Sequence, residues 1–169
     1  MDQLWAPWRL AHVAAAKPQT NGDPCFLCHA LSESDDRKNL IAFRGESCVA
    51  VLNRFPYNNG HLLVAPRAHK GELQELTAHE VAEVHQTIVR LIEVFDRLMR
   101  PEGYNMGVNL GRAAGAGLPG HLHWHVVPRW NGDTNFMPIL ADVKVIAQSL
   151  DSLWELLASE LGQKKNVMP

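Results

Sequence analysis

The chain has 169 residues, of which 46% are apolar and 20% are charged, an ordinary composition for one folded domain. Its net charge is −2 with nine neutral histidines, so we expect no large basic surface and no nucleic acid partner. A small anionic ligand remains compatible with this charge, because backbone N–H groups and histidines bind phosphate locally. No apolar stretch is long enough to span a membrane, and residues 1–20 lack the pattern of a secretion signal, so no membrane partner is expected.

The first half of the chain predicts an arm, a cysteine pair and three strands. Residues 1–23 are rich in Trp, Pro and Ala without periodicity, and we expect them to form an N-terminal arm. A domain at 24–139 follows, and it begins with the pair Cys25 and Cys28 and a polar loop at 32–38. Short apolar runs at 40–43, 48–52 and 61–65 predict strands, with a Pro/Asn/Gly turn at 56–60 before the third.

The second half predicts two helices and two strands. Thr77 and Glu80 have the spacing of a capping box, and apolar residues then recur at helical spacing as far as Leu98. Strands are expected at 104–110 and 121–128, separated by a glycine-rich loop at 111–120. The unit at 140–169 is a final helix, with apolar positions from Val143 to Leu161, and a tail. Strands in hairpin-like succession predict an α+β fold with a mainly antiparallel sheet.

The most informative segment is a row of three histidines, His121, His123 and His125. Alternate residues of a strand share a face, so the three imidazoles would project together, about 7 Å apart. A solvated polar face and a three-histidine metal site are the two alternatives. The glycine-rich loop directly before the row favours phosphate chemistry, because its backbone N–H groups can approach an anion closely.

The sequence resembles the histidine triad superfamily in three separate motifs. They are Asn109-Leu110-Gly111 with the AGAG loop, the stretch HLHWHVVPR, and the region from Leu52 to Pro66 with its asparagine and fourth histidine. The flanking pieces WAPWR (5–9) and PRWNGD (128–133) resemble the branch that contains bacterial diadenosine tetraphosphate phosphorylases. This resemblance implies an antiparallel sheet with a long helix, and a homodimer.

The resemblance also implies roles for individual residues. His123 would be the nucleophile that forms a nucleotidyl-histidine, and a largely neutral imidazole at pH 7 suits that role. His125 and His61 would donate hydrogen bonds to the phosphates. Nucleotide-binding positions would be Asn53 (ribose), Asn109 (phosphate), and Gly115 and Gly117 in the loop. For Asn53 the alternative is a turn residue, and for His61 a buried structural histidine.

One departure from the family concerns the loop. Other branches carry a glutamine, then a serine or threonine, four and three positions before the first histidine of the row, where this chain has Gly117 and Leu118. Polar contacts to the leaving phosphate would then come from the backbone. This difference speaks against a dinucleoside triphosphate hydrolase and favours the phosphorylase-like branch.

The cysteines indicate a metal site. Three cysteines, one of them Cys48, argue against a disulfide framework and predict a cytoplasmic protein. By spacing alone, Cys25 and Cys28 are ambiguous between metal binding, redox chemistry and simple burial. In family members with this pair, a later histidine and the first histidine of the row complete a structural zinc site, which implies Cys25, Cys28, His69 and His121 as ligands. His29 is a rival ligand.

Together these features predict a nucleotidyl transferase or hydrolase that acts on a dinucleoside polyphosphate, with inorganic phosphate as a possible second substrate. Cleavage of a nucleoside phosphoramidate, a zinc hydrolase built on the three histidines, and a nucleotide-binding protein without turnover remain as alternatives.

Overall fold

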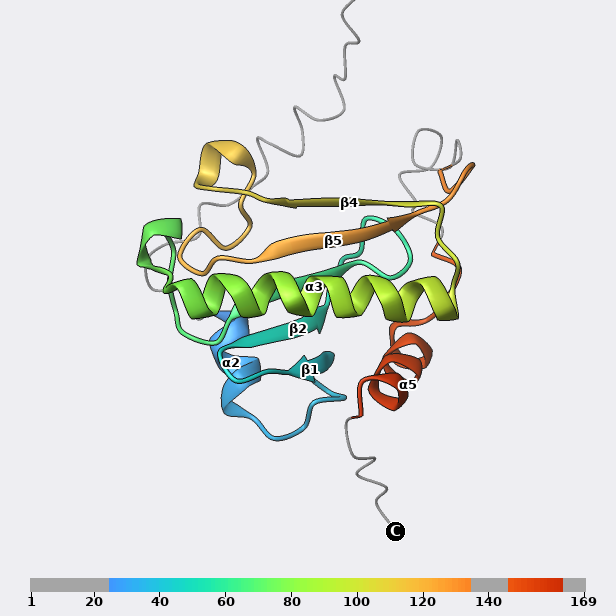
Figure 1. The fold of residues 1–169 in the computed structure, drawn as a ribbon, viewed down its shortest axis with the longest axis horizontal. Helices are drawn as coiled ribbons and strands as arrows, with labels where there is room; N and C mark the ends of the chain where they lie inside the picture. The colour runs from blue at the N-terminus through green and yellow to red at the C-terminus, as the bar shows by residue number, and fades with distance from the viewer. Residues whose placement is uncertain (1–24, 135–145, 163–169) are drawn as a thin grey trace, which may run out of the picture.

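The computed structural model describes residues 25–134 and 146–162. The expected N-terminal arm, with its tryptophans, lies outside the described residues. The described chain forms a five-stranded sheet in the order β1-β2-β3-β5-β4, with every neighbouring pair antiparallel (Figure 1). The strands are β1 (Ile41–Arg44), β2 (Cys48–Leu52), β3 (Leu62–Pro66), β4 (Gly103–Val108) and β5 (Trp124–Arg129). The expected α+β fold with an antiparallel sheet is confirmed.

One face of the sheet is covered by the long helix α3 (Ala78–Leu98), which crosses it in Figure 1. The capping box is formed: the Thr77 side chain accepts from the backbone of Glu80, and the Glu80 side chain accepts from the backbone of Thr77. Leu91 and Phe95 of this helix are fully buried against the strands. Helix α5 (Leu150–Glu160) adds Leu153 and Leu157 to the same core. None of the described helices is long and apolar enough to cross a membrane.

The opposite face of the sheet is only partly covered. The short helix α2 (Phe26–Ser32) packs Leu27 and Ala30 against Ile41 and Val49. Its seven residues are too few for a periodic pattern, which is why the sequence did not predict it. Helix α2 lies over β1 and β2, and no helix of the described residues covers the part of this face that belongs to β5 and β4.

The remaining differences from the expected elements are at their ends. The last helix begins at Leu150, since the Ser149 side chain caps it by accepting from the N–H of Ser152. Of its expected positions, Val143 lies outside the described residues. The expected strand at 121–128 joins the sheet only from Trp124, although the chain before it is already buried. Two 3₁₀ turns, at Leu73–Glu75 and Arg112–Ala114, complete the described elements.

Candidate active site and metal centre

The side chains of β5 alternate between the two faces of the sheet. The Trp124 ring meets that of His85 on α3, and Val126 belongs to the core beneath the same helix. His125 and Val127 therefore lie on the open face. Opposite His125, the paired residue of β4 is Gly107, and a Cβ there would meet no atom within 4 Å. The glycine leaves room for a ligand above His125.

The ring of His123 is held in one orientation by the backbone. Its Nδ1 lies 2.9 Å from the carbonyl oxygen of His121, and the residue is 6% exposed. A carbonyl only accepts hydrogen bonds, so Nδ1 carries the proton and Nε2 keeps its lone pair. An imidazole with this tautomer can act as a nucleophile at Nε2 without a separate base.

A chain of hydrogen bonds defines the protons of the two other histidines. The backbone N–H of Tyr57 donates to Nδ1 of His61 at 3.0 Å, so that nitrogen is an acceptor. His61 Nε2 then carries the proton and donates to Nδ1 of His125, 2.9 Å away. As a result, His125 has its own proton on Nε2. His125 can therefore donate a hydrogen bond from Nε2.

His125 is a neutral donor at physiological pH. Burial, with a smaller contribution from nearby His123, lowers its pKa from 6.5 to about 4. The ring of Tyr57 stacks on that of His125, with centroids 5.6 Å apart, and also packs against His61 at 4.5 Å. A neutral imidazole with a fixed N–H stabilises negative charge that develops on a phosphate, and it costs no reorganisation.

The expected nucleotide-binding residues lie around this row. Asn53 follows β2, where its Oδ1 accepts from the N–H of Phe55 at 2.9 Å and its Nδ2 lies 3.2 Å from Nδ1 of His61. The residue is therefore both a turn residue and a neighbour of His61. Asn109 directly follows β4, and Gly115 adopts φ +86°, a conformation that favours glycine.

The structure accounts for Leu118. Where other branches have a polar residue, Leu118 is 7% exposed and joins Leu27 in the cluster beneath α2. At Gly117, by contrast, a Cβ would meet nothing within 4 Å. The leucine is thus explained by packing, and the glycine leaves open space on the loop.

The four expected metal ligands come together at the start of the row. Cys25 Sγ lies 3.2 Å from His121 Nδ1, and Cys28 Sγ lies 3.2 Å from His69 Nδ1. All four ligand atoms are within 4.8 Å of one another, and the two 3.2 Å contacts are close to the edge of roughly 3.3–3.8 Å expected for a tetrahedron with bonds of about 2.0–2.3 Å to zinc. Among the described residues, this cluster takes one histidine from the row, and no cluster contains all three.

The surroundings of the cluster suit a metal. His121 is fully buried, and its Nε2 donates to the carbonyl of Pro66 at 2.8 Å, which turns the Nδ1 lone pair towards the cysteines. Burial lowers the pKa of His121, which keeps it neutral as a ligand must be. Burial and the adjacent Cys25 raise the pKa of Cys28 to about 11. A bound divalent cation would offset this cost of forming thiolates.

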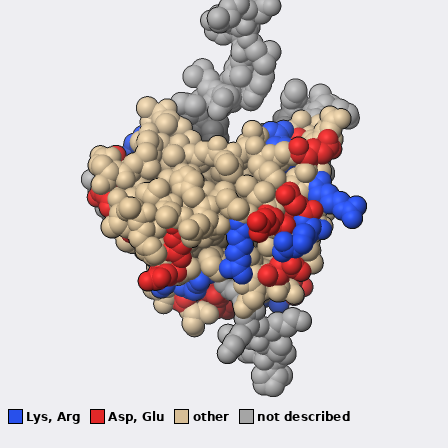
Figure 2. Space-filling model, viewed as in Figure 1, with Lys and Arg blue, Asp and Glu red and all other residues tan. Residues whose placement is uncertain are grey.

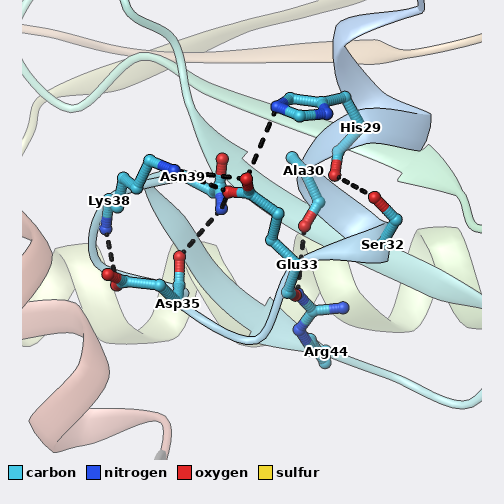
Figure 3. Close-up of polar contacts among 8 residues, drawn as sticks. All are labelled: His29, Ala30, Ser32, Glu33, Asp35, Lys38, Asn39 and Arg44. Atoms are coloured by element: carbon cyan, nitrogen blue, oxygen red, sulfur yellow. Dashed lines mark hydrogen bonds and ion pairs between the residues drawn. The ribbon is translucent and has the colours of Figure 1, made fainter.

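His29 is directed elsewhere, although it lies next to Cys28 in the sequence. Figure 3 shows its ring directed at Glu33, one turn along the chain, and the Nε2–Oε1 distance is 3.6 Å. In the same view Arg44 of β1 binds carbonyls at the end of α2, with 2.9 Å to that of Glu33 and 3.3 Å to that of Ala30. The guanidinium caps α2 and fixes the helix that contains Cys28 and has Cys25 as its N-cap.

Comparison with known proteins identifies the family. A family model described as the HIT domain matches residues 35–132. A Mycobacterium tuberculosis protein named AP-4-A phosphorylase is 41% identical over 168 residues, which are 97% of this chain and 86% of that protein. The chain belongs to the HIT-domain family.

Other HIT proteins agree with this assignment. The crystal structure of a Zn-bound histidine triad family protein from Mycobacterium smegmatis superposes with a TM-score of 0.64 at 26% identity, and covers 82% of this chain and 94% of that one. An asymmetrical bis(5'-nucleosyl)-tetraphosphatase from Schizosaccharomyces pombe is 28% identical over 93 residues, 55% of this chain and 50% of that protein. The expected family and the expected nucleotide-processing enzyme are confirmed.

Two features next to the histidine row were not predicted from the sequence. Tyr57 was seen only as part of a turn, yet its backbone and ring position both His61 and His125. Arg129 and Asp133 were noted only as flanking residues, yet they form a bidentate ion pair with 2.6 and 2.9 Å contacts at the end of β5. No local pattern could reveal either feature, because the Tyr57 ring meets His125 of β5 and Arg129 binds Asn105 of β4 only after folding.

Proposed function

We propose that this HIT protein cleaves dinucleoside polyphosphates, in the manner of a diadenosine tetraphosphate phosphorylase, by way of a nucleotidyl-histidine on His123. The observation that carries the proposal is the bond from His123 Nδ1 to the His121 carbonyl, which leaves Nε2 as a nucleophile beside the Nε2–H of His125. The similarity to the Mycobacterium tuberculosis AP-4-A phosphorylase supports the choice of substrate.

In the first step, the lone pair of His123 Nε2 attacks the α-phosphorus. An N–P bond forms, and the bond from phosphorus to the bridging oxygen breaks, so the rest of the substrate leaves with the electron pair. His125 donates from Nε2 to the negative charge that develops, and His61 keeps that donor in place.

In the second step, an oxygen of inorganic phosphate attacks the same phosphorus and releases His123. Diadenosine tetraphosphate would then give ADP and ATP. With water as the acceptor, AMP and ATP would form instead. Gly117 favours the phosphate acceptor, since it leaves open space on the loop where other branches have a glutamine.

The remaining nucleotide contacts follow from position. Asn53 would meet the ribose hydroxyls with its amide, because its oxygen is used by Phe55. Asn109 and the backbone of the loop at Gly115 and Gly117 would meet the oxygens of the reacting phosphate.

We also propose that Cys25, Cys28, His69 and His121 hold a structural zinc ion, for which their donor set and spacing are suitable. When bound, zinc would join the start of α2 to the histidine row and take no part in the reaction. His121 has two functions in this arrangement, since its ring would bind the metal while its carbonyl orients His123.

Two further proposals concern assembly and location. Strand β4 lies at the edge of the sheet, Met106 on it is 57% exposed, and Figure 2 shows few charged side chains over its left half and the loop that follows. An uncharged edge strand can pair with another chain, which supports a homodimer. All three cysteines are free, which supports a reducing, cytoplasmic location.

The proposed function is tested with diadenosine tetraphosphate, with and without inorganic phosphate, and products separated by ion exchange. ADP plus ATP formed only with phosphate supports the phosphorylase, and AMP plus ATP without phosphate identifies a hydrolase. In the His123→Ala variant, we expect turnover to fall by several orders of magnitude while bound zinc is retained. Loss of the metal in this variant would instead favour a zinc hydrolase built on the three histidines.

A further inference from the structure

A cavity of about 200 Å³ lies on the open face of the sheet beyond His125. Its walls come from the turn before β3, from β4, from β5 and from the chain after β5. The lining residues are Tyr57, Asn58, Asn105, Val127, Arg129 and Thr134. It borders the histidine row directly, because the Tyr57 ring stacks on His125 and Val127 is the next residue of β5 on the same face.

The order of side chains along this face of β5 places the cavity at one end of the histidine row. Alternate residues of β5 and of the chain just before it follow one another along this face at intervals of about 7 Å, in the order His123, His125, Val127 and Arg129. The cavity therefore begins next to His125, the proposed hydrogen-bond donor to the phosphate. At the other end of the row, His121 is fully buried against the cysteine pair. A substrate chain that extends from His123 along β5 therefore runs towards the cavity.

Arg129 supplies a positively charged group at this cavity. Its Nε and Nη2 donate to the two oxygens of Asp133, and its Nη1 donates to Oδ1 of Asn105 at 2.6 Å. These described partners use three of its five N–H groups and leave two for a ligand. Arg129 is 42% exposed, whereas Asp133 is only 6% exposed. The surface thus presents the guanidinium and keeps the carboxylate behind it.

The arginine is also held rigidly. Asp133 accepts two further hydrogen bonds, from Asn58 Nδ2 at 2.7 Å and from the N–H of Trp130 at 3.1 Å. Because Arg129 already occupies the Asn105 oxygen, the amide nitrogen of Asn105 remains as a second donor at the wall. A guanidinium fixed in this way, next to an amide donor, suits the oxygens of a phosphate chain.

We propose that this cavity binds the phosphates of the leaving nucleotide, with Arg129 as the residue that recognises them. The proposal rests on the function proposed above and adds to it a preference for long polyphosphate substrates. A substrate whose leaving group lacks phosphates, such as adenosine 5'-phosphoramidate, makes no contact there. Arg129 would thus distinguish the two substrate classes without touching the reacting phosphorus.

A binding experiment tests the cavity independently of turnover. Calorimetry with inorganic tripolyphosphate would compare the unchanged protein with the Arg129→Gln and Asn105→Asp variants. We expect each variant to weaken binding about 10- to 100-fold, as for a lost or opposed charged hydrogen bond. Arg97→Gln is the matched control, since Arg97 lies on α3, on the other side of the sheet, and pairs with Glu160. Asn105→Asp leaves the Arg129–Asp133 pair intact and guards against misfolding of the first variant.

A kinetic experiment then tests the preference. For Arg129→Gln, kcat/KM with diadenosine tetraphosphate should fall about tenfold or more, mainly through KM, and that with adenosine 5'-phosphoramidate should stay within about twofold. Equal losses with both substrates would overturn the proposal, as would unaltered tripolyphosphate binding or its absence in the unchanged protein. Failure of the proposed function is distinct: no variant and no unchanged protein would then turn over either substrate, while the binding result still stands.

Discussion

The hydrogen bond between His61 and His125 allows a quantitative test of the site. His61 is 1% exposed, and its Nε2–H is the group that fixes the proton of His125 on the nitrogen facing the ligand. Changing His61 to Phe fills a similar volume but removes this donor. Without it, Nδ1 of His125 loses its partner, and the proton is free to move to that nitrogen. A His125 ring with that tautomer presents a lone pair to the phosphate instead of a donor.

The size of the effect follows from two contributions. Loss of one buried hydrogen-bond partner costs about 1–3 kcal/mol. Loss of a preorganised donor to charge in a transition state costs about 10²- to 10³-fold in kcat. Since the donor is displaced and not deleted, we expect kcat to fall about 30- to 300-fold, with KM changed less.

The assay is steady-state turnover of diadenosine tetraphosphate and of adenosine 5'-phosphoramidate by the His61→Phe and His61→Gln variants. The glutamine amide reaches approximately as far as Nε2 and can donate to His125, so this variant should recover part of the lost rate. Thermal unfolding of both variants controls for packing around Tyr57. A normal kcat in His61→Phe would refute the tautomer argument, and equal losses in both variants would assign His61 a packing role.

Three other predictions concern the metal, the pH and the assembly. Cys25→Ser should lower both the zinc content, measured by mass spectrometry, and the melting temperature. The control Cys48→Ser, outside the cluster, should keep one zinc per chain. Full zinc retention in Cys25→Ser would contradict the proposed structural site. The pKa of His125 is about 4 when folded and 6.5 when exposed, so unfolded chains bind more protons between these values, and the contribution of His125 to stability should fall by about 1–2 kcal/mol from pH 6.5 to 5. Urea unfolding should show a smaller pH slope in His125→Gln than in the unchanged protein, and equal slopes would contradict the low pKa of His125. Light scattering should give about twice the 18.9 kDa of one chain, and Met106→Lys should shift it to the monomer; a monomeric unchanged protein would contradict pairing through β4.

The local patterns of this chain were enough to predict most of the sheet and the long helix. The apolar run at 48–52 matches β2 at both ends, and the Thr77–Glu80 spacing located the start of α3. The short helix α2 was missed, since seven residues with Cys25 as their cap carry too weak a periodic signal. Leu118 shows a further limit, because its burial under α2 depends on a helix 86–92 positions earlier in the chain.

The sequence by itself determined the chemistry that is available: a row of histidines on one strand face, a glycine-rich loop before it, and a cysteine pair. Only the tertiary structure decided which histidine joins the cysteines and which ring nitrogens carry the protons. It brings Cys25 to 3.2 Å from a histidine 96 residues away, which places His121 in the cysteine cluster and apart from His123 and His125. It also sets the protons of His123 and His125 through a carbonyl and a distant backbone N–H. Spacing along a chain specifies which face a side chain takes, but hydrogen-bond direction is a property of atoms that meet only after folding.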